Sequence, residues 1–84
     1  MSLNKLKGVL STLNLPHDSY SINHDSNESL CFITEPHGYV IYYSEKGQRT
    51  GETWFINEEE ACQQFMVMLR HMLGLSSGDD AEQL

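Results

Sequence analysis

The chain has 84 residues, a formal net charge of −7 and two cysteines. This length holds one domain, and two cysteines are too few for a disulfide scaffold. The excess of 12 acidic over 5 basic residues argues against binding to nucleic acid, whose phosphates must be neutralised. No apolar run approaches the length of a membrane-spanning helix, which needs about 18 apolar residues. No signal peptide is visible, so we expect a cytoplasmic protein.

The first predicted element is a helix over residues 2–14. Its leucines recur at spacings of three and four, which places them on one helix face: Leu3, Leu6, Leu10 and Leu13. Ser2 is a suitable N-cap, and Pro16 ends the helix because the residue before proline avoids helical dihedrals. A short strand is a candidate at residues 20–22, and the polar residues 23–29 are typical of a turn.

Two runs rich in β-forming residues then predict a hairpin, at residues 30–34 and 39–43. The turn between them contains Pro36 and Gly38, which suit tight turns. The predicted register pairs Thr34 with Tyr39, so Phe32 lies opposite Ile41.

Residues 44–50 are charged and contain Gly47, which predicts a hairpin loop, and residues 51–56 form a third strand. A slip of one residue in this strand exchanges which of Trp54 and Phe55 faces inward. The second helix begins after Asn57, a suitable cap for a first turn of three glutamates, and Gly74 ends it. Residues 1–75 therefore form a single domain, and residues 76–84 are expected to be a flexible acidic tail.

The predicted fold class is α+β, in the order α-β-β-β-α. An antiparallel meander of three strands, or four if residues 20–22 pair, packs with two helices. Its strands are apolar on both faces. One face carries Leu30, Phe32, Tyr39, Ile41 and Tyr43, and the other carries Cys31, Ile33, Val40 and Tyr42. Two arrangements stay open: both helices on one face, which exposes aromatic surface on the other, or both faces covered by the helices or by the N-terminal segment.

Residues of the types that carry catalysis or bind metals are scattered. The histidines lack the spacing of a metal pair: His17, His24, His37 and His71. Cys31 and Cys62 are predicted to be small buried residues with free thiols; whether they approach each other stays open. The carboxylates that could form an acid–base pair lie in or beside polar turns, where nothing predicts desolvation: Asp18, Asp25, Glu28 and Glu35. We expect no catalytic residue, no metal, no cofactor and no enzymatic activity.

Other residues are candidates for binding a partner. Helix capping explains Glu60 fully and Glu58 partly, which leaves Glu59 for docking to a basic protein. The aromatic candidates are Tyr42, Tyr43 and Trp54, of residue types enriched at interface hot spots. The alternative is that they are ordinary strand aromatics beneath helices. Because their positions alternate between the faces, we do not expect all three to be buried.

The C-terminal half resembles small bacterial immunity proteins of polymorphic-toxin and contact-dependent-inhibition systems. The resemblance rests on Tyr-Tyr-Ser-Glu-Lys-Gly at residues 42–47, Trp54-Phe55, and Glu-Glu-Glu-Ala-Cys-Gln-Gln-Phe at residues 58–65. It implies a cytoplasmic antidote that binds one cognate toxin domain and has no catalytic residues.

Net charge gives an independent argument for a basic target. Nuclease toxins are usually basic at their active face, so an acidic inhibitor gains fast, steered association. The residues expected to pair with the charges of such a toxin are Glu45, Glu52, Glu58 and Glu59. The aromatic contacts would come from Tyr42, Tyr43 and Trp54.

Two other functions compete with this one. A small acidic adaptor or regulatory domain would bind a basic protein with no toxin involved. An enzyme would need a convergent polar pocket, for which no motif is present. The exposed strand edges are compatible with a monomer or a weak homodimer.

Overall fold

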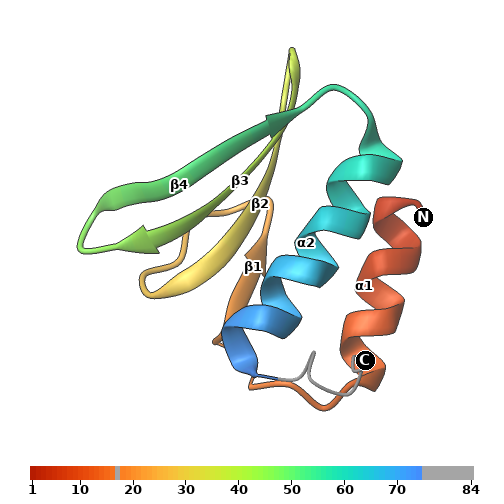
Figure 1. Ribbon diagram of the computed structural model, residues 1–84, viewed down its shortest axis with the longest axis horizontal. Coiled ribbons are helices and arrows are strands. Elements are labelled where there is room, and N and C mark those ends of the chain that lie inside the picture. Colours follow the sequence, from red (N-terminus) through yellow and green to blue (C-terminus); the bar gives the residue numbers. More distant parts are fainter. Residues whose placement is uncertain (17, 75–84) are drawn as a thin grey trace.

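The structure is a computed structural model that describes residues 1–16 and 18–74. Its elements follow in the order α1 (Leu3–Thr12), β1 (Tyr20–Ile22), β2 (Ser29–Glu35), β3 (Gly38–Glu45), β4 (Gln48–Phe55) and α2 (Glu58–Leu73) (Figure 1). The architecture is therefore α+β, as predicted, with residues 20–22 as a fourth strand. The predicted acidic tail and His17 lie outside the described residues.

Both helices begin at their predicted N-caps and α2 ends at the predicted Gly74, whereas α1 ends at Thr12, two residues before the predicted end. The Oγ of Ser2 accepts a hydrogen bond from the backbone N–H of Lys5 at 3.2 Å, which caps α1. The Oδ1 of Asn57 accepts one from the N–H of Glu60 at 3.1 Å, which caps α2. At the other end of α2, Gly74 adopts the left-handed conformation, with φ 73°.

The sheet is mixed, which corrects the prediction of a purely antiparallel meander. Its strand order is β1-β2-β3-β4, and β1 pairs with β2 in parallel, Tyr20 opposite Leu30. Parallel neighbours usually need a long crossover. Here the first strand has only 3 residues, so a short return over residues 23–28 brings the chain back to the start of β2. We call residues 23–28 the crossing segment.

The hairpin of β2 and β3 has the predicted register. Thr34 pairs with Tyr39, and Phe32 pairs with Ile41. The second hairpin is longer than predicted, because Ser44 and Glu45 belong to β3 and residues 48–50 belong to β4. The loop is only Lys46-Gly47, whose φ angles of 51° and 78° are both positive, as a two-residue turn of the I′ kind requires.

The strand β4 has an irregular register beside Gly51. The pairing shifts between Ile41 and Tyr43, so β4 contains a bulge there. Beyond it, Trp54 pairs with Val40. Phe55 packs on the cluster that contains the helices, and Trp54 is therefore the residue of this pair that faces away from them.

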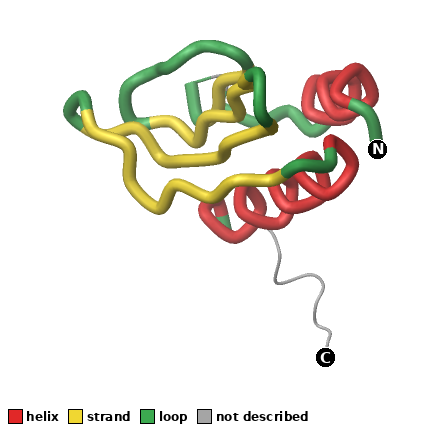
Figure 2. The backbone as a smooth tube through the Cα atoms, turned by 90° about the horizontal axis from the view of Figure 1, so that it is seen from above, coloured by secondary structure: helices red, strands yellow, loops and turns green. Residues whose placement is uncertain are grey.

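The two sheet faces are covered differently. The face that packs against both helices, the helix face, holds the main core, with Phe32 and Ile41 beneath Phe65 of α2 and Leu6 and Leu10 of α1. The opposite face, the loop face, holds a smaller cluster: Cys31, Val40 and Tyr42, with Ile33 packed against it. Figure 2 shows α2 on one side of the sheet and a loop on the other. Both helices thus pack on one face and leave Trp54 exposed on the other, as the first alternative predicts. The cover of part of the second face by the crossing segment was not predicted.

The turn before β3 gives a testable prediction. Gly38 has φ +153°, and a Cβ there would overlap the carbonyl oxygen of Phe55. We expect Gly38→Ala to lower the free energy of unfolding by about 1–3 kcal/mol. The matched control is Gly8→Ala, because Gly8 lies inside α1 with nothing within 4 Å of the added Cβ. It should raise stability by about 0.5–1 kcal/mol. Urea denaturation measures both, and equal stability of the two variants would contradict the close approach of the turn to β4.

Candidate partner-binding surfaces

The structure distributes the seven candidate binding residues over three places. Glu58 and Glu59 lie at the start of α2. Tyr43 and Glu45 lie on the end of β3 that leads into the second hairpin. Tyr42, Glu52 and Trp54 lie on the loop face or beside it. No single surface therefore collects all seven.

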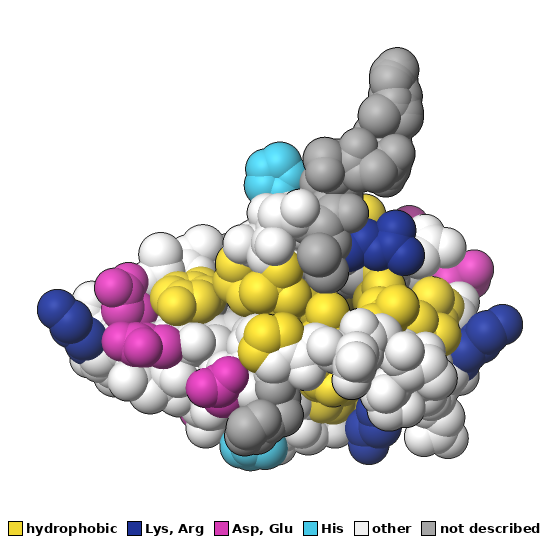
Figure 3. Space-filling model, turned by 90° about the horizontal axis from the view of Figure 1, so that it is seen from below, with side chains coloured by type: hydrophobic (Ala, Val, Ile, Leu, Met, Phe, Trp, Pro, Cys, Tyr) yellow, Lys and Arg dark blue, Asp and Glu magenta, His cyan; other side chains and the backbone are white. Residues whose placement is uncertain are grey.

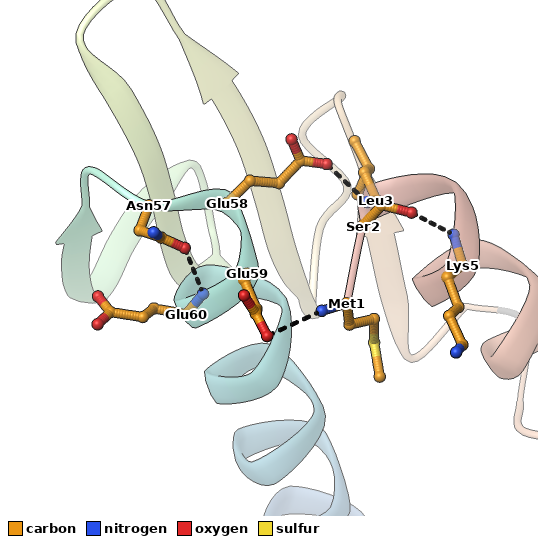
Figure 4. A network of polar contacts seen from close by, with 8 residues as sticks. All are labelled: Met1, Ser2, Leu3, Lys5, Asn57, Glu58, Glu59 and Glu60. Carbon is orange, nitrogen blue, oxygen red and sulfur yellow. Dashed lines mark hydrogen bonds and ion pairs between the residues drawn. The ribbon is translucent and has the colours of Figure 1, made fainter.

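Glu58 stabilises the fold. Its Oε2 accepts a hydrogen bond from the backbone N–H of Leu3 at 2.6 Å, which joins the first turns of the two helices (Figure 4). Its Oε1 accepts from the hydroxyl of Tyr39 at 3.5 Å. Burial, and then the charge of Glu58, raise the pKa of Tyr39. The contact with α1, 55 residues away in sequence, has no local signal and could not be predicted.

Glu59 stays accessible. Its carboxylate lies 3.5 Å from the N-terminal ammonium of Met1, and its side chain is 65% exposed (Figure 4). Such an exposed ion pair contributes little stability. Glu59 is therefore free to act on an approaching partner through its charge.

Tyr42 is not available to a partner, because it is 1% exposed. Its hydroxyl donates to Oδ2 of Asp25 at 2.8 Å, and the hydroxyl of Ser44 donates to Oδ1 of the same carboxylate at 2.9 Å. Burial, and then the bond to Asp25, raise the pKa of Tyr42. These two bonds anchor the crossing segment on the loop face. Sequence reasoning placed Asp25 in a hydrated turn and missed this role, because it depends on the parallel pairing of β1.

The Asp25 anchor predicts a pH dependence of stability. The hydrogen bonds from Tyr42 and then Ser44 lower the pKa of Asp25 below its ordinary value of 3.8. The ionised carboxylate thus stabilises the fold above that pH, and the stabilisation is lost as the pH falls through the lower folded-state pKa. We expect Asp25→Asn to flatten the decline of the urea midpoint between about pH 5 and about pH 2. A decline as steep as that of the wild type would contradict the anchor.

The strand β4 presents one candidate surface on the loop side. The guanidinium of Arg49 lies 4.4 Å from the ring centroid of Tyr42 and pairs with Glu52 at 2.9 Å. The hydrogen bond from Arg49, and then one from the Trp54 side chain, lower the pKa of Glu52. Trp54 is nevertheless 51% exposed, and Ile56 is 90% exposed. We call Arg49, Glu52, Trp54 and Ile56 the β4 surface.

The β4 surface also belongs to a sheet edge. β4 is the last strand of the sheet, and every residue from Gln48 to Trp54 is exposed. An exposed edge strand has backbone groups free for pairing with another chain. The bulge beside Gly51 interrupts this edge and limits extended pairing.

A second candidate surface is a groove of about 630 Å³ on the helix side. It lies between the C-terminal half of α2 and the strands β2 and β3. Its lining is mostly apolar: Leu30, Tyr43, Gln64, Val67, Met68, His71 and Met72. We call this groove, with the lining residues just given, the α2 groove. Figure 3 views the molecule from the end where α2 terminates, and hydrophobic side chains form a belt across this view.

The groove contains residues that sequence reasoning assigned otherwise or missed. The apolar spacing of the second helix predicts one core-facing stripe: Ala61, Phe65, Met68, Leu69, Met72 and Leu73. Met68 does pack against the main core but also lines the groove, and Met72 lines the groove and is 40% exposed. Val67 lies outside that stripe and is 57% exposed. Val67 is an apolar residue on the otherwise polar side of the helix, and this position was the one sequence signal that could have indicated the groove.

The two cysteines cannot pair in this fold. Cys31 lies in the loop-face cluster, whereas Cys62 lies in the main core on the other side of the sheet. Both thiols are free, and burial raises the pKa of each, so neither is activated as a nucleophile. His24, His37 and His71 are exposed. Within residues 1–16 and 18–74, no group of three or more histidine, cysteine or acidic side chains could hold a metal.

Comparison with known proteins adds no family. No family model, curated protein or solved structure matches this chain. Neither helix of the described part of the chain is long and apolar enough to span a membrane.

Proposed function

We propose that this chain is an immunity protein, which binds a cognate toxin domain in the cytoplasm and blocks its active face. A basic nuclease is the favoured class of toxin. The observation that carries the proposal is the β4 surface, where a half-exposed tryptophan lies beside an ordered arginine and glutamate on an edge strand. Tryptophan and arginine are the residue types most enriched among interface hot spots.

The loop face supports this surface as a rigid platform. The ring of Tyr42 lies under the guanidinium of Arg49, and Asp25 holds the Tyr42 hydroxyl from the other side. Arg49 is thereby pre-organised, which reduces the entropy lost on binding. In this proposal Tyr42 positions Arg49 and does not itself touch the toxin, and Glu58 keeps its structural role.

Long-range charge supplies the second part of the proposal. The formal net charge of −7 attracts a basic domain and raises the association rate at low salt. Glu52 is paired with Arg49, so its charge is partly neutralised. Glu45 and Glu59 are exposed and are the better candidates for steering.

Growth rescue tests this function. Each open reading frame that flanks the native gene is expressed alone and together with this chain. We expect one to arrest growth alone, and the chain to restore growth and to copurify with the product in fixed stoichiometry. Trp54→Ala should abolish the rescue, whereas the control Val67→Ala, at a residue 57% exposed on the helix side, should retain it. Absence of any toxic flanking product would overturn the proposal.

A second candidate function is a small acidic adaptor unrelated to toxins. The α2 groove favours it, because an apolar groove beside a helix suits recognition of a partner segment. An adaptor predicts a partner that is not toxic when expressed alone. The same co-expression experiment therefore separates the two functions.

A further inference from the structure

The α2 groove exposes apolar surface that the fold itself does not use. Val67 is 57% exposed and Met72 is 40% exposed, and both line the groove with Met68, Leu30 and the half-buried Tyr43. Exposed apolar patches of this kind on small proteins mark interaction sites. The groove is shallow and largely open to solvent, so it does not enclose the 70–90% or more of a ligand's surface that a small-molecule site typically buries. A longer, continuous occupant fits it better.

The charges around the groove select among such occupants. No lysine or arginine is among its lining residues. Glu45 is exposed on β3, two residues beyond Tyr43, and side chains two apart share a sheet face. Glu60 is exposed on α2, four residues before Gln64 and thus on the same helix face. In Figure 3, acidic side chains lie beside the hydrophobic belt on the side of the β3–β4 hairpin, and basic side chains lie at the opposite end of the belt. The hairpin end of the groove therefore complements an apolar segment that carries positive charge.

We propose that the α2 groove binds one amphipathic helix of a partner protein. Its apolar face lies against Val67, Met68 and Met72, and its lysine or arginine residues lie toward Glu45 and Glu60. The unbranched, polarisable methionines adapt to different apolar side chains, as they do in other grooves that bind helices. This proposal does not rest on the immunity function, because the β4 surface lies on the other face of the sheet.

The chain has four methionines and a single tryptophan, so NMR signals from these few side chains can report on both faces of the sheet in one experiment. The full chain is labelled on its methionine methyl groups and on the Trp54 indole, and is titrated with a synthetic helical peptide of leucine and lysine. We expect saturable shifts of the Met68 and Met72 methyl signals. The signals of Met1, of the core residue Met66 and of Trp54 should move little. A control peptide with glutamate in place of every lysine should bind at least about tenfold more weakly.

Two variants at exposed residues sharpen the result. Val67→Asp places a charge in the groove without touching the core and should weaken peptide binding at least about tenfold. Glu45→Gln should weaken it several-fold and reduce its dependence on salt. The matched control Trp54→Ala, on the other face, should bind the peptide like the wild type.

Several results would overturn the proposal. Shifts centred on the Trp54 indole would place binding on the β4 surface. Equal affinity for the acidic peptide would remove the role of charge, and the absence of saturation would remove the site. If the methyl signals of Met68 and Met72 shift when only the protein concentration is raised, the occupant of the groove is a second copy of the chain. If the Met68 and Met72 methyl signals of the Leu84→Ser variant differ from those of the wild type in the absence of peptide, the occupant of the groove is the chain's own C-terminal segment.

Discussion

Replacing Phe65 with alanine is expected to lower the free energy of unfolding by about 3–5 kcal/mol. Phe65 is fully buried at the centre of the main core. Its ring meets the rings of Phe32 at 5.6 Å and Tyr20 at 6.5 Å, both edge to face. It therefore joins α2 to two strands, and the truncation leaves a cavity between them. A domain of this size has a total stability of only about 4–12 kcal/mol, so the variant loses a large part of it.

Urea denaturation followed by circular dichroism measures the loss. The matched control is Val67→Ala, two residues along the same helix but 57% exposed, which should change stability by less than about 0.5 kcal/mol. If Phe65→Ala does not fold at all, Phe65→Leu should show a loss of about 1–2 kcal/mol. Similar stabilities for the Phe65 and Val67 variants would contradict a core centred on Phe65.

Replacing Trp54 with alanine should weaken binding of the cognate partner by about 30-fold or more, which corresponds to the 2 kcal/mol that defines a hot spot. The effect follows from the large aromatic area that Trp54 offers on a rigid strand, while half of the side chain lies free of the fold. Folding stability should fall by less than about 1 kcal/mol, because the lost packing is mainly against the cross-strand neighbour Val40. Calorimetric titration with the partner identified by growth rescue measures the affinity.

Two controls make this result interpretable. Folding must be followed by circular dichroism, because Trp54 is the only tryptophan and its removal abolishes the fluorescence signal. Val67→Ala tests the opposite face and should leave the affinity unchanged. If Val67→Ala weakens binding and Trp54→Ala does not, the partner occupies the α2 groove, and the proposed role of the β4 surface is wrong.

Much of the fold could be predicted from local patterns. The leucines of α1 and the caps of α2 are determined by residues within a few positions of each other, and the structure confirms both helices. The register of β2 and β3 was predictable because Pro36 and Gly38 locate the turn between two apolar runs. The prediction made the strands of the second hairpin too short. The residues of β4 lie at the edge of the sheet, and most of them are exposed. They show no apolar alternation from which a strand could be recognised.

The candidate site was less predictable than the fold. The residue types of Trp54 and Glu59 suggested binding, and both are exposed. The residue types of Tyr42 and Glu58 suggested partner binding equally. In the structure, however, Tyr42 is buried under the crossing segment and Glu58 joins the two helices. Residue type alone does not distinguish an interface anchor from an aromatic or acidic residue that the fold itself uses.

The sequence by itself determined the two helices, the central hairpin, the separation of apolar residues onto two sheet faces and the acidic charge. Each depends on interactions between residues close in sequence or on composition alone. Only the tertiary structure decided that β1 pairs in parallel, that residues 23–28 cover the loop face through Asp25, and that α2 leaves a groove against β2 and β3. These features depend on contacts between distant segments. Their free energy comes from burying surfaces and hydroxyl groups that no local pattern brings together.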